Sequence, residues 1–486
     1  MRTLATLALA LSSLPALAAT PPLAPLQNLA EHGARVSALV VRLDSGASLA
    51  SLHDRLALTP ASVSKLYVAA AALHQWGPDY RFTTRFLGTG PVKNGILEGN
   101  LVFAGAGDPA LTNEQLFILT RRLAERGIHK VKGKLIIDAS YFGRIACATD
   151  DRCTARHASH NAYDALLSSA AVNFANAELV VMPASRPGKP ASVRIAPVNI
   201  PAIRVRNEVI TGPAGSGWTI GIDRRTEHGR DVFIARGRVP SGADPKRYWR
   251  ALGHPDAATG SLLASLLAES GIRIEGGMDI RHSGSVPGRT LARIHGQPLW
   301  LQLRRMLTWS NNYMADTFTL DLLRAIQTPP LRLHAGGRLL TRFGRGLEAD
   351  SGLWNGKGKP TLQLESGSGL TTSSQASALD LVALLAGMYR QPGLFPSFLG
   401  ALTVPGYTPV DMLKDARDAA WMRAVAAKTG SLEQPHSVFA LAGYARLADG
   451  HWGAFAVLIN GTKTHQVPLH TAIDATREAL TPFLQK

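Results

Sequence analysis

The chain has 486 residues and a mass of 51.8 kDa, with 45% hydrophobic and 18% charged residues. This composition excludes a disordered chain and a single small module, and the length predicts more than one hydrophobic core. Lys and Arg number 52 against 35 Asp and Glu, a formal net charge of +17 that raises nucleic acid, an anionic membrane surface or an acidic substrate as partners.

The first twenty residues have the layout of a secretory signal peptide. Arg2 precedes an apolar run over 4–14, and Pro15 and the small residues 16–19 follow. We expect residues 1–19 to be cleaved near Ala18 and Ala19, which leaves a periplasmic protein with a charge of +16 (17 − 1, for Arg2). A short N-terminal core helix is the alternative. No other segment approaches the ~18 apolar residues of a membrane span, so we expect no transmembrane anchor, and export argues against nucleic acid as a partner.

Only two cysteines occur, Cys147 and Cys153, and they enclose five residues. In an exported chain this pair favours one small-loop disulfide over a metal site, because no Cys-x-x-Cys and no His-Glu-x-x-His motif is present. Two free thiols remain the alternative. We expect no metal and no cofactor.

The N-terminal elements predict a hairpin followed by a buried helix. Residues 36–43 form a strand-like run, Asp44-Ser45-Gly46 signals a turn, and residues 47–52 return as the second strand. Thr59-Pro60 then leads into an Ala/Leu-rich helix over 65–73.

The middle of the chain, about 83–285, predicts a β-rich insertion. Its strand-like runs are short, β-branched or aromatic, and separated by Gly, Pro and Asn. They lie at 99–103, 134–138, 179–182, 192–195 and 231–235, with helical stretches at 113–126 and 260–270. The Pro-, Gly- and Arg-rich centre, about 180–240, predicts a small β unit of its own.

The remainder predicts helices, then a second strand pair, then a last helix. A helical region over 297–326 is broken near 308–312, and a helix over 376–389 would be capped by a residue of Thr371-Thr372-Ser373-Ser374. Strand-like runs follow at 437–447 and 452–460, and an amphipathic helix at 469–484.

Three short motifs occur in order: Ser62-Val63-Ser64-Lys65, Ser310-Asn311-Asn312 and Lys428-Thr429-Gly430. Of 13 lysines, only Lys65 has a serine three residues earlier and only Lys428 begins a Lys-Thr-Gly. Residues i and i+3 at the head of a helix lie about 5–6 Å apart at Cβ, so the Lys65 amine can reach the Ser62 hydroxyl. Order and context together make three weak matches a specific pattern.

These residue types suit nucleophilic acyl transfer. A serine hydroxyl needs a base, and no Gly-x-Ser-x-Gly elbow points to a histidine. Lys65 would act as the base when neutral, and a nearby cation such as Lys428 would lower its pKa. Ser310 could relay a proton, Asn312 could bind the substrate's amide, and Lys428 with Thr429 suits a carboxylate. The pattern predicts an acyl donor that ends in a free carboxylate.

Each motif alone also has a structural interpretation. Ser62 can be only a helix N-cap, Ser310-Asn311-Asn312 only a polar kink between helices, and Lys428-Thr429-Gly430 only the end of an edge strand. All three interpretations together, in this order, explain the pattern less well than a single active site.

The chain resembles the D-alanyl-D-alanine carboxypeptidase/endopeptidase family, the DacB-like low-molecular-mass penicillin-binding proteins with three domains. The resemblance covers nearly the whole mature chain and lies in the three motifs, the preceding hairpin, and the segments Gly107-Asp108-Pro109-Ala110-Leu111-Thr112, Ser366-Gly367-Ser368-Gly369-Leu370 and Lys428-Thr429-Gly430-Ser431-Leu432. Ser366 departs from the family, which usually has Asp before Gly-Ser-Gly-Leu.

The resemblance implies a serine peptidase that cleaves peptidoglycan stem peptides and their cross-links and is acylated by β-lactam antibiotics. By motif, Ser62 is the nucleophile and Lys65 the general base. Ser310 and Asn312 form the second motif. Lys428, Thr429, Gly430 and Ser431 form the substrate-binding strand, and the amides of Ser62 and Ser431 form the oxyanion hole.

The implied fold class is α/β (α+β), a transpeptidase-like domain of the penicillin-binding-protein and serine β-lactamase type, whose antiparallel sheet is covered by helices. We expect the sheet to have five strands, from the N-terminal hairpin and the C-terminal strands. Ser62 and Ser310 are 248 residues apart (310 − 62), so the β-rich middle third must be inserted between them, and the resemblance implies that it forms two domains. We expect a catalytic domain at 20–82 and 285–486, an inserted domain at 83–178 and 241–284, and a nested domain at 179–240.

Two other functions remain open. One is a serine β-lactamase, although no Glu-x-x-Leu-Asn pattern that would activate a deacylating water occurs in the sequence. The other is a catalytically weak cell-wall-binding protein. Carboxypeptidase against endopeptidase preference, the diamino acid of the stem peptide and the oligomeric state are not determined by the sequence.

Overall fold

The computed structural model describes residues 23–145, 161–353, 361–407 and 419–485. The predicted signal peptide and both cysteines lie outside the described residues, so the cleavage site and the Cys147–Cys153 disulfide stay predictions. Within the described residues, no helix is long and apolar enough to cross a membrane.

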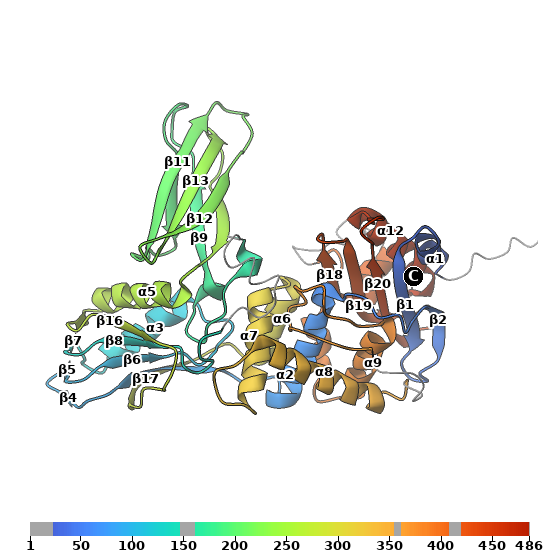
Figure 1. The fold of residues 1–486 in the computed structure, drawn as a ribbon, viewed down its shortest axis with the longest axis horizontal. Coiled ribbons are helices and arrows are strands. Elements are labelled where there is room, and N and C mark those ends of the chain that lie inside the picture. Colours follow the sequence, from blue (N-terminus) through green and yellow to red (C-terminus); the bar gives the residue numbers. More distant parts are fainter. Residues whose placement is uncertain (1–22, 146–160, 354–360, 408–418, 486) are drawn as a thin grey trace, which may run out of the picture.

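A five-stranded antiparallel sheet joins the two ends of the chain (Figure 1). Its order is β18-β19-β20-β1-β2, and β1 pairs with β20 from Arg35↔Asn460 to Arg42↔Gly453. The strands are β1 (Arg35–Arg42), β2 (Ser48–Leu52), β18 (Val425–Leu432), β19 (Val438–Arg446) and β20 (Trp452–Asn460). The predicted sheet and fold class are confirmed.

Period-2 alternation distributes the sheet's side chains between two cores. On β1, Val36, Ala38 and Val40 belong to one core and Leu39 and Val41 to the other. The first core lies under α1 (Ala24–Glu31), α11 (Ala419–Ala424) and α12 (Leu469–Leu480), which the short turn η4 (Thr481–Phe483) follows. The larger core lies between the other face of the sheet and a set of helices. These are α2 (Lys65–Trp76), α6 (Leu299–Thr308), α7 (Asn312–Arg324), α8 (Leu333–Asp350), α9 (Ala378–Tyr389) and α10 (Phe395–Ala401).

Sequence patterning missed α8 and misplaced the cap of α9. Gly337 and Gly344 lower the helix propensity of α8, yet both lie where the helix is closely packed: a Cβ at Gly344 would collide with Leu362 and Tyr67. The cap of α9 is Ser377, which forms a capping box with Asp380, so none of the predicted residues 371–374 caps this helix.

The insertion forms a second five-stranded sheet, with the order β16-β8-β6-β3-β17. Its strands are β3 (Thr83–Gly88), β6 (Leu101–Ala104), β8 (Leu135–Asp138), β16 (Met278–Arg281) and β17 (Arg289–His295); α3 (Asn113–Ala124) and α5 (Pro255–Glu269) pack on it. A small sheet beside it holds β4 (Val92–Lys93), β5 (Ile96–Leu97), β7 (Lys130–Val131) and β15 (Arg273–Ile274). Because β17 pairs with β3, we place the end of this unit after His295, beyond the predicted boundary at 285.

A further β unit rises from this sheet (Figure 1). It contains two three-stranded sheets, β10-β9-β14 and β11-β13-β12. The strands are β9 (Asn176–Met182), β10 (Ser192–Ala196), β11 (Ile203–Gly212), β12 (Gly221–Glu227), β13 (Arg230–Pro240) and β14 (Lys246–Ala251). Its β9 is entered through the turn η3 (Asn173–Ala175), and its strands span the predicted nested domain at 179–240.

Two buried acids lie inside the larger core. Glu348 of α8 is 3% exposed, and burial, followed by the nearby Asp380, raises its pKa to about 8. One oxygen of Glu348, one of Asp380 and the hydroxyl of Tyr67 have no hydrogen-bond partner among the described residues. The folded protein therefore favours the protonated form of Glu348.

Replacing Glu348 should flatten the pH dependence of stability. The folded carboxyl keeps its proton up to about pH 8, whereas an unfolded glutamate releases it near 4.5, so the wild-type free energy of unfolding falls as pH rises between these values. E348Q cannot release a proton and should show a shallower decline in urea titrations at pH 5 to 8. E125Q, exposed at the end of α3, is the control, and equal slopes in wild type and E348Q would contradict the prediction.

Candidate active site

Ser62 lies in a short 3-10 turn, η1 (Ala61–Ser64), that leads directly into α2. Ala61 has a φ of 47°, a left-handed conformation that L-residues rarely adopt. Ser62 is half-buried, whereas Lys65, one 3-10 turn later, has no exposed surface. The turn thus presents the hydroxyl at the surface of the core and places the amine beneath it.

The Lys65 amine lies within hydrogen-bond distance of oxygens from three separate segments. Its Nζ is 2.8 Å from Ser62 Oγ, 2.8 Å from Asn312 Oδ1 and 2.6 Å from the carbonyl oxygen of Ser368. The structure therefore brings the predicted nucleophile, base and second-motif asparagine together. The Ser368 contact was missed, although its segment was noted in the sequence.

The second motif is the junction between α6 and α7. Ser310 has a φ of 49°, and its amide donates to Leu307 O, which ends α6. Asn311 caps α7 by accepting from Met314 N at 2.9 Å. The motif is therefore both a polar kink between helices and a component of the site. The kink directs Ser310 and Asn312 toward the other motifs.

Lys428 links the edge strand β18 to the second motif. Its Nζ donates to Ser310 Oγ at 3.0 Å and to Thr429 O at 2.6 Å. Lys428 is 2% exposed, and burial lowers its pKa to about 7. Thr429 beside it is half-buried and Ser431 is exposed, so this end of β18 borders the site.

Gly430 allows β18 to approach the nucleophile. A Cβ at this position would lie 2.8 Å from Ser62 N and 3.0 Å from Pro60 O, closer than real Cβ contacts come. Glycine is therefore required by close packing of β18 against η1. The backbone of Gly430 is not in the left-handed region, so glycine is required here by the lack of room for a side chain and not by the backbone conformation.

Residues 366–370 lie against η1 and are hydrogen-bonded to both η1 and α7. Ser64 Oγ donates to Gly367 O at 3.0 Å, and Ser368 N donates to Asp316 Oδ1 of α7 at 2.9 Å. Ser366, which replaces the family's usual Asp, is buried, and its Oγ lies 3.2 Å from Ser368 Oγ. The segment holds the carbonyl that accepts from Lys65.

The insertion reaches the site at Tyr163. Tyr163 lies in the turn η2 (Ala162–Asp164), and its carbonyl accepts from Asn312 Nδ2 at 3.2 Å. Both polar atoms of the Asn312 amide are thus engaged, one with Lys65 and one with the insertion. No local signal in the sequence marks Tyr163, because the contact spans 149 residues.

Gly107 and Asp108, from the second quoted segment, join the insertion to α7. A Cβ at Gly107, whose φ is +72°, would collide with Asp321 of α7. Asp108 Oδ1 accepts from Ala110 N at 3.0 Å, and burial raises the pKa of Asp108 to about 6. This segment is a structural contact between the two parts of the chain, apart from the three motifs.

The model of the D-Ala-D-Ala carboxypeptidase 3 (S13) family matches residues 24–480. The chain belongs to this family. It is therefore a serine-type peptidase, and the resemblance noted in the sequence is confirmed.

Two curated relatives have comparable length. A D-alanyl-D-alanine carboxypeptidase of Actinomadura sp. (strain R39) is 28% identical over 464 residues, 92% of this chain and 81% of that protein. The carboxypeptidase DacB of Haemophilus influenzae is 26% identical over 461 residues, 91% of this chain and 90% of that protein.

The fold is shared with solved structures. Penicillin binding protein 4 (dacB) from H. influenzae matches with a TM-score of 0.76 at 20% identity, over 94% of this chain and 99% of that one. A second structure of that protein, complexed with a novel beta-lactam, matches with a TM-score of 0.72 at 21% identity, over 95% and 99% of the two chains. The catalytic-domain fold is that of penicillin-binding proteins.

Substituting Gly430 tests whether close packing of β18 forms the site. G430A should reduce hydrolysis of a D-Ala-D-Ala peptide by ~10-fold or more, because a Cβ forces η1 and β18 apart by a few tenths of an ångström. The melting temperature of G430A should stay close to that of the wild type, in contrast to its activity. G346A, at a position in α8 with no atom near the new Cβ, should keep wild-type activity. Equal rates for G430A and G346A would refute this role.

Proposed function

We propose that this protein is an exported D-Ala-D-Ala carboxypeptidase and D,D-endopeptidase that acts on peptidoglycan stem peptides and their cross-links through an acyl-Ser62 intermediate. The observation that carries the proposal is the 2.8 Å contact between Lys65 Nζ and Ser62 Oγ, in a buried position that Asn312 and Ser368 define. Family membership supplies the reaction class.

The partners of Lys65 support its role as the general base. A carbonyl oxygen and an amide oxygen can only accept, so Ser368 O and Asn312 Oδ1 take the two N–H groups of a neutral amine. The nitrogen lone pair is then directed at Ser62 Oγ, whose hydroxyl can donate. Lys65 accepts that proton as Oγ bonds to the carbonyl carbon of the penultimate D-Ala.

The rest of the reaction follows from the neighbouring groups. The carbonyl oxygen becomes negative in the tetrahedral intermediate, beside the amides of Ser62 and Ser431. The C–N bond breaks as Ser310, hydrogen-bonded to Lys428, relays to the leaving amine the proton that Lys65 took from Ser62, so Lys65 is neutral and Ser310 protonated again. Water then attacks the ester with Lys65 as base, which releases the shortened peptide and restores the Ser62 hydroxyl.

Lys428 and Thr429 would hold the terminal carboxylate of the substrate. The ammonium supplies charge and the hydroxyl a donor, at the outer edge of the five-stranded sheet. A cross-linked peptide presents the same D-Ala carbonyl, joined to another stem, so the same nucleophile serves both cleavages.

Export and β-lactam inhibition belong to the same proposal. Residues 1–19 have signal-peptide layout, and the mature charge of +16 suits an anionic envelope. The related H. influenzae protein has been solved in complex with a beta-lactam. A β-lactam carries a reactive carbonyl and a carboxylate, the two features that Ser62 and Lys428 would recognise.

Penicillin should acylate Ser62. Intact-mass spectrometry of the purified mature protein should show one equivalent of added penicillin, and peptide mapping should locate it on Ser62. S62A should show no adduct while keeping the wild-type circular dichroism spectrum. An adduct elsewhere, or none on folded protein, contradicts the mechanism, and rapid turnover of a chromogenic cephalosporin would favour a β-lactamase instead.

The alkaline limb of the pH profile should report Lys428. Its pKa is about 7, so its positive charge is present below that pH and is lost as pH rises through it. For a peptide with a free terminal carboxylate, kcat/KM should fall roughly tenfold per pH unit well above 7, because the neutral amine no longer pairs with the carboxylate. The same peptide with an amidated terminus is the control and should lack this limb. Identical profiles for both peptides would refute the assignment.

A further inference from the structure

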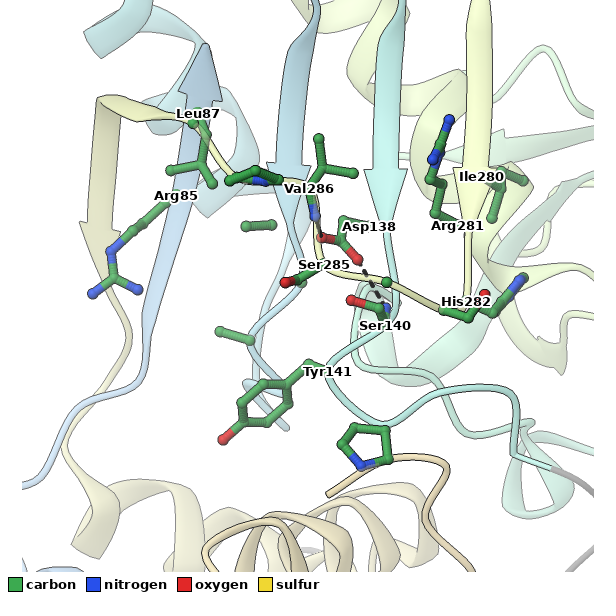
Figure 2. Close-up of a pocket in the computed structure, with 18 of the residues that line it drawn as sticks. Arg85, Leu87, Asp138, Ser140, Tyr141, Ile280, Arg281, His282, Ser285 and Val286 are labelled. Atoms are coloured by element: carbon green, nitrogen blue, oxygen red, sulfur yellow. Dashed lines mark hydrogen bonds between the residues drawn. The ribbon is translucent and has the colours of Figure 1, made fainter. Parts of the chain in front are cut away.

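A cavity of about 1170 Å³ lies where the inserted sheet meets the helices of the catalytic domain (Figure 2). One wall is the insertion, and the other contains Arg324 at the end of α7 with Pro329 and Pro330 of the following loop. None of the residues of the three motifs lines it. Arg324 is twelve residues after Asn312, ~18 Å along α7, so the cavity is separate from the candidate active site.

The insertion's wall is the carboxyl edge of three parallel strands. β6, β8 and β16 pair in parallel, with Ala104 opposite Asp138 and Asp138 opposite Arg281 at their ends. Figure 2 shows Asp138, Ser140 and Tyr141 at and after the end of β8, and Arg281 and His282 at the end of β16. In α/β sheets, ligands bind outside the carboxyl ends of parallel strands.

The charge of the lining is strongly positive. It contains four arginines and one carboxylate, that of Asp138. Both oxygens of Asp138 already accept backbone amides, from Ser140 at 2.9 Å and Val286 at 3.1 Å. Arg281 has a partner in Asp279, at 3.5 Å. The other three arginines form no ion pair with a carboxylate of the described residues; they are Arg85, Arg144 and Arg324.

Arg324 packs against Tyr141 and has no carboxylate partner in the part of the chain that the structure describes. Its guanidinium carbon lies 5.1 Å from the centre of the Tyr141 ring, and its Nε is buried with no hydrogen-bond partner among the described residues. Asp321, one turn earlier on α7, is fully buried, and burial raises its pKa well above the usual range, so it is not a fixed negative charge. A stacked, unpaired guanidinium beside a large cavity is suited to an incoming carboxylate.

We propose that this cavity is a second binding site, for the carboxylates of a peptidoglycan peptide, and that Arg324 and Arg85 are its main anion contacts. The proposal rests on the proposed function for the choice of an acidic peptide as ligand. The two arginines line the cavity from opposite walls, Arg85 on β3 and Arg324 on α7. A bound peptide would therefore join the insertion to the helix that begins at Asn312.

The test uses the full mature chain with S62A, which binds peptides without turning them over. The probe is a soluble muropeptide tetrapeptide, which lacks the terminal D-Ala and is not a substrate, titrated by isothermal calorimetry. We expect one site, with R324Q and R85Q each weakening binding ~10-fold or more. R204Q, an exposed arginine on β11, is the matched control and should bind as the parent does.

Three further arms separate the alternatives. The same peptide with amidated carboxylates should not bind. Inorganic phosphate that binds more tightly than the peptide, and is lost in R324Q, would overturn the carboxylate assignment. Wild-type protein acylated by penicillin should still bind the tetrapeptide, whereas loss of binding would place the peptide at Ser62.

Failure of this inference is distinct from failure of the proposed function. Undiminished binding in R324Q and R85Q, or no binding at all, refutes the second site even when penicillin acylates Ser62. Conversely, a protein that penicillin does not acylate still gives a result in the S62A titrations. Because Arg85 is exposed, R85Q tests the site even if R324Q does not fold.

Discussion

The position of the Lys65 amine is the constraint on which the rest of the site depends. A buried lysine needs acceptors, and here they come from η1, α7 and the segment 366–370, which lie far apart in the chain. Each of these segments is fixed in turn, by the Asn311 cap, by the Ser64–Gly367 bond and by the Ser368–Asp316 bond. The position of the Lys65 amine beside Ser62 is therefore set by the packing of three segments.

Close backbone approach is the second constraint. Gly430 leaves room for β18 against η1, and Gly369, at a φ of +70°, leaves room for Ala61 O. Ala61 and Ser310 both take left-handed backbone conformations beside the reactive groups. Such conformations cost about 1–3 kcal/mol each and persist only where surrounding packing compensates, here a core made of six helices and one sheet face. The catalytic geometry is thus stabilised by the size of the domain that the two chain ends build together.

The helix α7 connects the two halves of the molecule. Its first turn presents Asn312, Asp321 in its last turn packs against Gly107, and its last residue, Arg324, lines the interdomain cavity. The insertion contacts the site through Tyr163, at Asn312, and contacts the same helix again through Tyr141, at Arg324. The basic composition of the chain is also concentrated here, because three arginines that have no carboxylate partner among the described residues line one cavity. The insertion therefore contributes to the surroundings of the site as well as to the size of the protein.

The sequence by itself determined the reaction class, the three motifs and most strands, because each of them depends on local spacing. Ser62 and Lys65 lie on one turn, and the alternation of residues on either side of Asp44-Ser45-Gly46 predicts β1 and β2. Its patterns failed where tertiary packing overrides propensity. The helix α8 tolerates Gly337 and Gly344 because other segments of the same chain leave no room for side chains there, and β17 pairs with β3 across about two hundred residues. Only the tertiary structure decided that Tyr163 meets Asn312, that Ser368 accepts from Lys65 and that Arg85 and Arg324 share a cavity, since these contacts join segments with no periodic relation in the chain.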